Sequence, residues 1–598
     1  MKRITALLLV LCMLLPLAAC GEKPAEPAPQ TTPTTPTTPS TPSDPTTPAE
    51  PTTPAEPTAP AEPEPEVYDF ESHLPLADPA EKKTLTIGLP VNALTTDYEN
   101  NDYTQWLEEK TGIDLKFATF AGTASDCATQ IALMIASGET LPDILLHFTG
   151  ISKTQGGQYG DDGAFVDLTD YFNDPEMTYY FRWGMKEIFA GQFITAEDVI
   201  ARAVTPQNGR IYNFPKLENC PEDNPKSHVS INQLWLDKLG LKAPTTIDEL
   251  YDVLVAFRDK DPNGNGQKDE IPMLGINGAS FRDVVHWLMN AFVFVNDSYW
   301  YNITDGKFWV PYTTDEYRQA LIYIKKLVDE GLLATQTWTL TTAELKSLLN
   351  PTDGVYKVGV IGADVYIDYL STSNSIFDYT QLAPLKDATG KGGYGPVAEC
   401  SISNYTFISS DCKEPELAFR LLDFMCSYEA EHRSRWGKEG VDWVESAPGA
   451  TGNLGGEAKF KVLGEDPFTT SNNKIWHIVD GLSSSLYAQQ EVDLSDPTNW
   501  YTARTAHDRY LIDSYAEAGQ PDEVFYFALY TDEEVETRAD YVSDLTSYIK
   551  KARSNFCNGN IDPNNDKDWN DYLDTLKQLR IDDWLQSGQT AYDRTFNK

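Results

Sequence analysis

The segment TLTIGL at residues 84–89 alternates polar and apolar side chains, which is the pattern of a strand with a buried face. Outward from it we expect a helix over residues 103–110, a second strand over 113–117, a helix capped by Ser125 and a third strand over 143–146. Strands and helices that alternate with short loops predict a mostly parallel α/β sheet.

The middle of the chain predicts more helix. Thr246 and Glu249 have capping-box spacing ahead of apolar residues at helical spacing, and Thr313 and Glu316 begin a further helix, which Gly331 ends. Strand-like runs return at residues 356–361 and 405–408, and the remainder is helical. We therefore expect two α/β lobes joined by more than one crossover, with extra helices around the second lobe and a ligand between the lobes.

The first residues predict export. Met1-Lys2-Arg3 is a short cationic start, residues 6–15 are an apolar run, and small residues precede Cys20. The run is too short to span a membrane, so residues 1–19 are predicted to be a secretory signal peptide. The cysteine at the cleavage point looks like a bacterial lipobox, in which Cys20 becomes the lipidated first residue. An ordinary signal peptide with an incidental cysteine is the alternative.

Residues 20–66 form a separate compositional segment. From residue 22 it is nearly all Pro, Thr, Ala and Glu, with no apolar side chain larger than alanine. Such a segment cannot bury a core and is expected to stay extended and partly polyproline-like. Beside a lipid anchor it predicts a tether that holds the folded domain off the membrane. The alternative is a non-specific disordered tail, which would be extended in the same way.

Composition limits the partners. The formal net charge is −43, which argues against nucleic acid or an anionic membrane surface as the ligand.

The remainder from about residue 67 is too long for one core and suggests two lobes. Six cysteines beyond Cys20 show no CxxC spacing, so disulfides and buried thiols both remain open. They are Cys127, Cys220, Cys400, Cys412, Cys426 and Cys557.

The segment DPNGNGQKDE at residues 261–270 carries the most specific local signal. Oxygen-bearing side chains fall at alternate positions, Gly266 permits a sharp turn, and two carboxylates follow, which is how one loop surrounds a hard cation. The loop begins like an EF-hand but has Pro272 where an EF-hand has its bidentate glutamate. A polar turn without a metal is the alternative. The predicted ligands are Asp261, Asn263, Asn265, the Gln267 carbonyl, Asp269 and Glu270.

Several segments resemble a known family. WLDKLGL at residues 235–241, PTTIDEL at 244–250 and the loop at 261–272 closely resemble the family 1 extracellular solute-binding lipoproteins of ABC transporters. The most similar branch includes alginate- and other oligosaccharide-binding proteins. Weaker matches extend from about residue 85 to 594, nearly the whole mature chain. They are GRIYNFP at 209–215, WGKEGVDW at 436–443, WNDY at 569–572 and AYDR at 591–594.

The resemblance implies an α/β fold of the two-lobe, type II periplasmic-binding-protein-like kind. On that reading the N-terminal lobe comprises residues 67–205 plus 355–410, and the C-terminal lobe comprises 206–354 plus 411–598. The resemblance also implies structural calcium in the loop at 261–270. Its expected partners are an oligosaccharide or other small solute and the ABC permease subunits, with the chain a monomer on the extracellular face of the cell membrane.

Sugar binding needs an aromatic face for the apolar side of the ring and polar groups for the hydroxyls. Our candidates are five residues, although a tryptophan on a helix is more often part of the core. Asp97 and Asn101 follow the first strand, a usual place for ligand contacts. The candidates are Trp287, Trp443, Asp97, Asn101 and Tyr394, with Trp300 and Tyr301 as further aromatic residues.

An enzyme is the rival class. Glu439 and Asp442 are paired carboxylates that could in principle support glycoside chemistry, but carboxylates are common throughout so acidic a chain. The sequence has no GxSxG, HExxH, Walker or dinucleotide-binding motif. We therefore expect no catalysis. A peptide-binding or sensory lipoprotein remains the alternative within the binding class.

Overall fold

The computed structural model describes most of the chain from Tyr68 onward. The described residues are 68–188, 196–203, 209–218, 227–296, 300–365, 367–387, 389–396, 401–453, 455–463, 470–477, 491–519 and 532–596. The predicted signal peptide, the predicted lipidation site Cys20 and the predicted tether lie outside them, as do Cys220 and Cys400. The other four mature cysteines, Cys127, Cys412, Cys426 and Cys557, are buried thiols.

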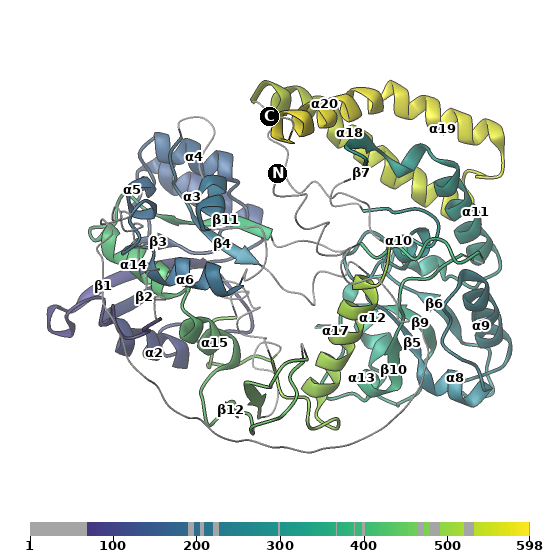
Figure 1. The fold of residues 1–598 in the computed structure, drawn as a ribbon, viewed down its shortest axis with the longest axis horizontal. Helices are drawn as coiled ribbons and strands as arrows, with labels where there is room; N and C mark the ends of the chain where they lie inside the picture. Colours follow the sequence, from purple (N-terminus) through teal and green to yellow (C-terminus); the bar gives the residue numbers. More distant parts are fainter. Residues whose placement is uncertain are drawn as a thin grey trace, which may run out of the picture. The chain divides into compact units, whose positions relative to one another are not determined.

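A five-stranded sheet organises the first lobe, in the order β2-β1-β3-β11-β4. Strand β1 pairs in parallel with β2 and β3, whereas β11 is antiparallel to both β3 and β4. Figure 1 shows β11, in green, among the purple and blue strands of the first part of the chain. The strands are β1 (Lys83–Pro90), β2 (Ile113–Phe120), β3 (Ile144–Leu145), β4 (Phe214–Glu218) and β11 (Ser401–Ile408).

Apolar cores lie on both faces of this sheet, because its strands contribute buried apolar side chains to each face. One core contains Leu85, Ile87 and Leu115, and a second, on β2, β3 and β11, contains Phe120, Leu145 and Phe407. The first-lobe helices are η1 (Pro79–Glu81), α2 (Asp102–Thr111), α3 (Ala124–Ser137), α4 (Lys153–Asp161), α5 (Thr169–Phe172), α6 (Tyr179–Ile188), α7 (Ala196–Ala203), α14 (Pro415–Phe424) and α15 (Tyr428–Trp436).

A four-stranded sheet organises the second lobe, in the order β10-β5-β9-β6. Strands β6 and β9 are parallel, and β5 runs antiparallel to β9 and to β10. The carboxyl ends of β6 and β9 therefore meet the amino end of β5 at one edge. The strands are β5 (Val229–Asn232), β6 (Ile271–Leu274), β9 (Val358–Gly362) and β10 (Tyr379–Gln381).

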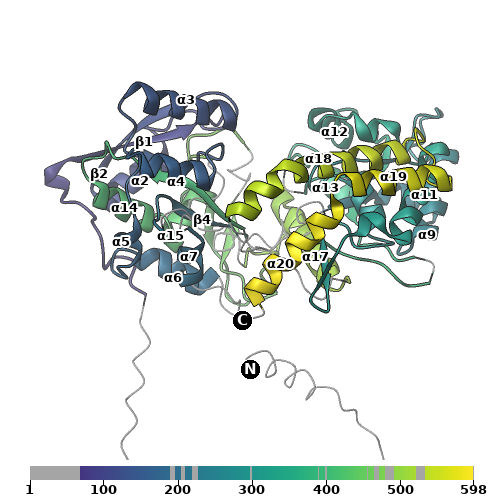
Figure 2. The same ribbon diagram turned by 90° about the horizontal axis from the view of Figure 1, so that it is seen from above.

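Two apolar cores flank the second sheet. The larger contains Ile231 and Val360 with Leu254 and Phe257 of α9 and reaches the C-terminal helices, and the smaller contains Leu274, Val358 and Ile361. Figures 1 and 2 show the yellow helices α18, α19 and α20 beside the teal elements of this lobe. The helices are α8 (Gln233–Leu239), α9 (Ile247–Asp259), α10 (Val284–Met289), η3 (Pro311–Thr313), α11 (Asp315–Asp329), η4 (Thr335–Trp338), α12 (Thr342–Leu349), α13 (Ser375–Asp378), α17 (Trp500–Ala516), α18 (Asp532–Cys557), α19 (Asp566–Gln578) and α20 (Ile581–Phe596).

Two small antiparallel pairs complete the described strands. Strand β12 (Trp443–Glu445) pairs with β13 (Phe460–Val462), and β7 (Asn302–Thr304) pairs with β8 (Lys307–Trp309). The β12–β13 pair has its own apolar cluster, in which Trp436 packs beside Phe460 and Tyr501. This cluster joins the end of α15 to the start of α17.

The sheet pairing changes the lobe boundaries predicted from sequence. We assigned residues 355–410 to the first lobe, but β9 and β10 pair with β5 in the second sheet, and only β11 joins the first. Conversely, β4 belongs to the first sheet although residues 206–354 were assigned to the second lobe. Helices α14 and α15 also pack on the first core rather than the second. An apolar run predicts burial but does not specify the sheet that buries it.

Two helix starts also differ from the predictions. The cap of α3 is Thr123, which forms a capping box with Asp126, and not Ser125. The cap of α11 is Thr314, which accepts from the Tyr317 amide, because Thr313 lies in the preceding turn η3. Helix α9 does begin after Thr246 as predicted, and the Thr246 hydroxyl accepts from the Glu249 amide, but the Glu249 carboxylate accepts from the Thr245 amide rather than from that of Thr246. Cap positions are specified locally only to within a residue or two.

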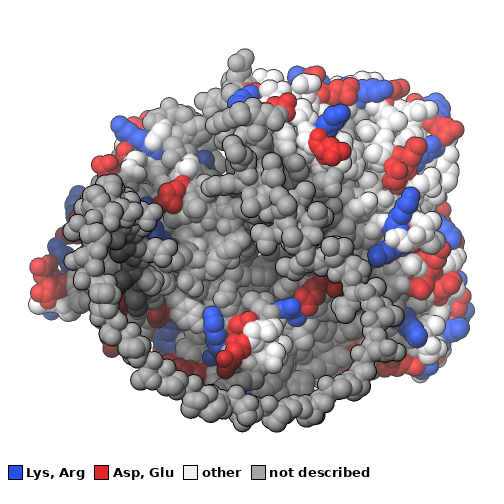
Figure 3. Space-filling model, in the orientation of Figure 1, with Lys and Arg blue, Asp and Glu red and all other residues white. Residues whose placement is uncertain are grey.

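Among the helices in the described part of the chain, none is both long and apolar enough to cross a membrane. On the face drawn in Figure 3, blue and red side chains are interspersed over the described surface and do not separate into patches of one sign.

Candidate functional site

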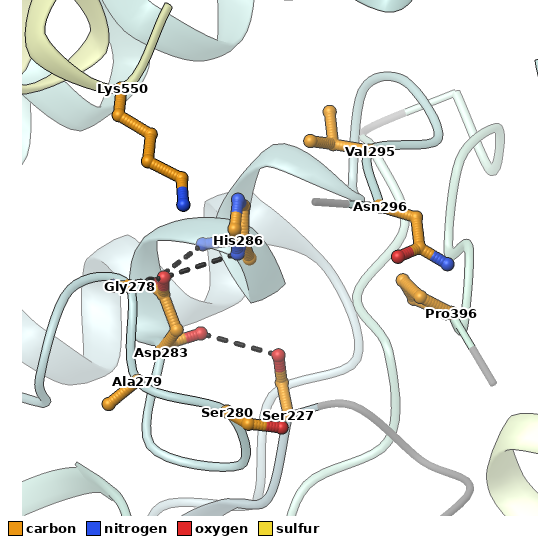
Figure 4. Close-up of a pocket in the computed structure, with 10 residues that line it drawn as sticks. All are labelled: Ser227, Gly278, Ala279, Ser280, Asp283, His286, Val295, Asn296, Pro396 and Lys550. Carbon is orange, nitrogen blue, oxygen red and sulfur yellow. Dashed lines mark hydrogen bonds and ion pairs between the residues drawn. The ribbon is translucent and has the colours of Figure 1, made fainter. Parts of the chain in front are cut away.

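A polar pocket of about 200 Å³ lies at the edge where β6 ends and β5 begins. In open α/β sheets this carboxyl edge is where ligands bind. Figure 4 shows side chains from several separate segments directed toward one space, with Lys550 of α18 opposite Ser227 and Ser280. The described lining residues are Ser227, Gly278, Ala279, Ser280, Asp283, His286, Val295, Asn296, Pro396 and Lys550.

Asp283 holds the floor of this pocket in place. It is the N-cap of α10, and its Oδ1 accepts from the amides of Val285 at 2.9 Å and His286 at 3.1 Å. Its Oδ2 accepts from the Gly278 amide at 2.6 Å, which ties the loop after β6 to the helix. Burial alone would raise the pKa of Asp283, but the hydrogen bond from His286, the charge of Arg553 and the Gly278 amide lower it overall. The carboxylate therefore stays ionised inside the protein.

His286 is fixed as one tautomer by its two neighbours. Its Nε2 lies 2.6 Å from the guanidinium of Arg553, which can only donate, so Nε2 must accept. The proton therefore resides on Nδ1, which lies 3.1 Å from Oδ2 of Asp283. This chain of three residues links the buried carboxylate to a cation on α18, and it presents a neutral imidazole at the pocket wall.

The remaining lining groups suit a neutral, hydroxyl-rich ligand. Ser227, Ser280 and Asn296 offer groups that both donate and accept hydrogen bonds, and Lys550 offers a donor. The hydroxyl of Ser227 also donates to the Asp283 carbonyl at 3.3 Å, as Figure 4 shows. Polar groups that converge on one small pocket can fix the orientation of a ligand bound there.

The two ligand residues predicted in the second lobe, Trp287 and Tyr394, lie in different environments. Trp287 is 2% exposed in the core under α10, so the prediction that it offers a stacking face disagrees with its position. The reason is that α10 is apolar on nearly all sides. Tyr394 is half-buried, its ring edge-on to Phe294 at 6.1 Å, and it lies two residues before Pro396 of the pocket wall.

The two ligand residues predicted in the first lobe, Asn101 and Asp97, differ in their exposure. Asn101 is fully buried and caps α2, and its amide group donates to the Ile475 carbonyl at 2.8 Å. Its role is therefore structural, in disagreement with the predicted ligand contact. Asp97 is exposed in the loop after β1, where hydrogen bonds from the backbone and side chain of Asn100 lower its pKa. Asp97 stays available to a ligand at the carboxyl edge of the first sheet.

Trp443 lines a second cavity, of about 400 Å³, on α2 and α15. Its ring meets His432 edge-on at 4.4 Å, and its indole donates to the Gly437 carbonyl at 3.2 Å. Phe70, Trp106 and Tyr428 also line this cavity, which lies over helices rather than at strand ends.

The carboxylates of Glu439 and Asp442 lie in different environments. Asp442 is buried, forms an ion pair with Lys474 and accepts from the Lys438 amide at 2.8 Å. Glu439 is exposed. Asp442 therefore stabilises the turn before β12.

The loop at 261–270 is folded as an oxygen-lined turn. Asp261, at a φ of 47°, accepts from the amides of Gly264 at 2.9 Å and Gly266 at 3.0 Å. The side-chain amides of Asn263 and Asn265 both donate to Oδ1 of Asp269, at 3.0 and 2.9 Å. The six predicted ligand residues therefore share one turn, between α9 and β6.

Two carboxylates show how this loop suits a cation. Oε1 of Glu270 is buried and has no hydrogen-bond partner among the described atoms, and burial raises the pKa of that carboxyl. Asp269 is bonded to Lys357 at 2.9 Å, and this ammonium, with the two Asn amides, lowers its pKa to about 2. In the described residues no cluster of three or more His, Cys, Asp or Glu side chains is assembled as a metal site. The ligand types nevertheless fit a hard cation such as calcium, because an orphaned carboxylate oxygen, further carboxylates and Asn oxygens share one turn.

Most of the pocket was not found from sequence. Its loop at residues 275–283 follows a strand, and the carboxyl-edge rule applied to β6 could have identified Ser280 and Asp283. No sequence signal connects Lys550 to Ser227, because helix α18 and the start of β5 lie far apart along the chain.

Two helix-covered α/β sheets, with a polar pocket at the strand ends of one, define a two-lobe solute-binding protein. The chain belongs to the bacterial extracellular solute-binding protein family, whose model matches residues 92–432, more than half of its 598 residues.

Individual relatives agree with this assignment. The fructooligosaccharide ABC transporter substrate-binding protein FusA of Streptococcus pneumoniae is 25% identical over 549 residues, 86% of this chain and 91% of that protein. Lipoprotein LipO of Bacillus subtilis is 27% identical over 259 residues, 42% of this chain and 45% of LipO.

Solved structures share the fold. FusA in complex with kestose superimposes with a TM-score of 0.64 at 23% identity, covering 86% of this chain and all of that one. A FusA EF-hand mutant in complex with fructo-nystose gives 0.65 at 23% identity, with the same coverage. An HMO-binding ABC-transporter-associated protein of Bifidobacterium longum infantis gives 0.65 at 21% identity, covering 86% of this chain and 99% of its own.

Proposed function

We propose that this protein captures an oligosaccharide outside the cell and delivers it to an ABC importer. The observation that carries the proposal is the polar pocket at the carboxyl edge of the second sheet, in a chain of the solute-binding family. Its hydroxyl, amide and ammonium groups match the hydroxyl pattern of a sugar. The relative that matches over most of both chains is named for fructooligosaccharide.

We further propose that the protein is anchored by a lipid on Cys20 and that it binds its ligand without turning it over. The lipobox-like sequence and the lipoprotein relative LipO support the anchor. Replacement of Cys20 by Ala should release the protein from the membrane fraction into the medium. Retention of the C20A protein in washed membranes would exclude this anchor.

Calcium is the structural cation that we propose for the loop at 261–270. Asp261, Asn263, Asn265, Asp269, Glu270 and the Gln267 carbonyl would hold it. A bound cation would fix the turn between α9 and β6, whose carboxyl end leads into the pocket loop. The EF-hand mutant of FusA supports the view that relatives of this fold carry such a loop.

The test of the proposed function is a binding screen on a chain that begins at Tyr68. Isothermal titration with kestose, nystose and oligosaccharides of alginate and polygalacturonan should show at least one saturable interaction. A melting temperature that rises with the same ligand confirms binding to the folded state. Binding of oligopeptides alone would favour the peptide-binding alternative, and consumption of a glycan would show an enzyme.

A further inference from the structure

We propose that the cavity of about 400 Å³ on α2 and α15 is a second binding site, for a small ring compound that carries a carboxylate. The cavity lies in the first lobe, and its described lining shares no residue with that of the polar pocket in the second lobe. Its volume is in the range of small-molecule sites. The inference goes beyond the proposed function and does not rest on it.

Aromatic side chains from separate segments form the wall of this cavity. Trp106 lies on α2, Tyr428 on α15, Trp443 at the start of β12, and Phe70 in the segment before β1. Helices α2 and α15 pack beside each other in the first lobe, as Figure 1 shows. Phe70, Trp106 and Trp443 are half-buried and line the cavity, so part of each side chain faces a ligand there. Such rings offer a surface on which another ring can stack.

A buried imidazole without a hydrogen-bond partner lies in the same wall. His432 lines the cavity and is 3% exposed, and neither ring nitrogen has a partner in the described structure. Its ring contacts are aromatic, with Tyr428 stacked at 5.4 Å and Trp443 edge-on at 4.4 Å. Buried polar groups are normally paired, and a neutral imidazole offers one donor and one acceptor. A ligand in the cavity would supply the missing partner.

Arg433, the next residue of α15, is a cation with too few partners for its donors. Its Nε is buried and unpaired, and its one hydrogen bond in the described structure is long, from Nη2 to the Asp102 carbonyl at 3.5 Å. Burial outweighs the charges of Asp102 and Asp442 and lowers the pKa of Arg433, so the site disfavours the charged form. A guanidinium presents its N–H donors in a fork that matches a carboxylate. A carboxylate in the cavity would therefore bond to donors that the protein leaves unpaired.

The charges around the cavity leave room for an anion. Lys110 is paired with Glu71 at 2.7 Å, and Glu429 accepts from the Tyr68 hydroxyl at 2.7 Å, while Glu439 is exposed at the rim. The cationic groups without a carboxylate partner among the described residues are Arg433 and Lys438. In a chain with a net charge of −43, two such cations at one cavity attract an anion. The charged lining residues are Lys110, Glu429, Arg433, Lys438 and Glu439.

The chemistry of the ligand follows from the wall and the cation together. A ring packs on the aromatic side chains, its carboxylate meets the guanidinium of Arg433, and a further oxygen bonds to a nitrogen of His432. An acidic sugar and an aromatic acid share this chemistry, and matched probes distinguish them.

The test uses two pairs of probes, and in each pair a carboxylate replaces a hydroxymethyl group. Isothermal titration of the full-length protein compares D-glucuronate with D-glucose, and benzoate with benzyl alcohol. We expect the acid of at least one pair to bind, and its neutral partner to bind at least about tenfold more weakly. Binding of glucuronate alone identifies an acidic sugar, and binding of benzoate alone an aromatic acid. A lack of binding by both acids, or equal binding within both pairs, would overturn the inference.

Variants of α15 test the two named residues. R433Q removes the charge and should raise the Kd of the acid by at least about tenfold, whereas R433K keeps the charge and should recover part of the affinity. H432F removes both ring nitrogens and keeps the aromatic packing, and it should raise the Kd by about fivefold. The matched control is R420Q, which removes a guanidinium from α14 of the same lobe, outside the described lining. It should leave the Kd unchanged.

Two outcomes would place the acid elsewhere. Wild-type affinity in R433Q or in H432F would overturn the site. Loss of acid binding in K550Q but not in R433Q would place the acid in the polar pocket and overturn it as well. Neither outcome alters the proposed function, because the oligosaccharide screen tests the polar pocket, and a failed screen leaves the titration of the acids unaffected.

Discussion

His432 illustrates what a single buried side chain contributes. It stacks on Tyr428 at 5.4 Å and meets Trp443 and Phe460 edge-on at 4.4 and 4.5 Å, with 3% of its surface exposed. Burial, with nearby Lys459 and Arg435, lowers its pKa to about 3. Neither ring nitrogen has a hydrogen-bond partner in the described structure. The imidazole is therefore neutral in the folded protein and behaves as an aromatic core residue.

This position makes stability depend on pH. Between its unfolded pKa near 6.5 and its folded pKa of about 3, His432 binds a proton only in the unfolded chain. Stability therefore falls as the pH drops through 6.5, by up to about 1.4 kcal/mol per pH unit from this residue. Replacement by Phe removes this contribution. We expect the unfolding free energy of H432F, relative to that of the wild type, to rise by about 2 to 3 kcal/mol as the pH falls from 7 to 4.5. Urea unfolding of both proteins at the two pH values measures this difference. Parallel pH profiles for the two proteins would contradict this.

At the scale of elements, the ion pair of Arg282 and Asp368 connects the pocket loop to the segment that follows β9. Both side chains are buried, and Asp368 also accepts from the Asp364 amide at 2.9 Å. Removing one partner leaves the other charge buried without compensation, so we expect R282A to lose about 3 to 5 kcal/mol of unfolding free energy. The double variant R282M/D368L should recover part of that loss. Equal stability of R282A and the wild type in urea unfolding would show that the pair is not buried in solution.

The loop at 261–270 is the second element with a measurable role. If it holds calcium, EGTA should lower the melting temperature and added calcium should restore it. D261A should melt lower than the wild type in calcium and should no longer respond to EGTA. The exposed carboxylate Asp252 on α9 provides the control, because D252N removes a charge without a loop ligand. An EGTA response that survives in D261A would place the cation elsewhere.

At the scale of the whole molecule, the first described residues form a strap across the first lobe. The hydroxyl of Tyr68 donates to Glu429 at 2.7 Å, its ring stacks on Trp183 at 4.9 Å, and Phe70 stacks on Phe424 at 5.6 Å. The Ala77 amide donates to the Thr111 carbonyl at 3.0 Å, just before β1. The fold therefore begins well before its first strand.

Truncation tests this strap. A chain that begins at Glu81 loses the apolar contacts of residues 68–77 with the first-lobe core, whereas a chain that begins at Tyr68 keeps them. We expect the shorter chain to lose about 3 to 6 kcal/mol and to melt at a lower temperature. A chain that begins at His73 should lie between the two. Equal urea midpoints for all three would show that the strap does not contribute.

The fold was predicted well where its signals are local. The first strand, the helix after it and the second strand lie at the expected positions, because alternation, capping and a closing glycine all act within a few residues. The two-lobe class and the family also followed from sequence. The lobe boundaries did not, because β4 and β11 pair in the first sheet and β9 in the second, and their apolar runs do not specify the partner strand.

The candidate site shows the same division. The sequence by itself determined the loop at 261–270, because all its oxygen groups come from one short segment whose spacing is fixed by the chain. It also identified aromatic residues, but only tertiary packing decided that Trp287 lies in the core. The tertiary structure alone brought Ser227, Ser280 and Lys550 together, since groups that converge from distant segments leave no periodic signal in any one of them.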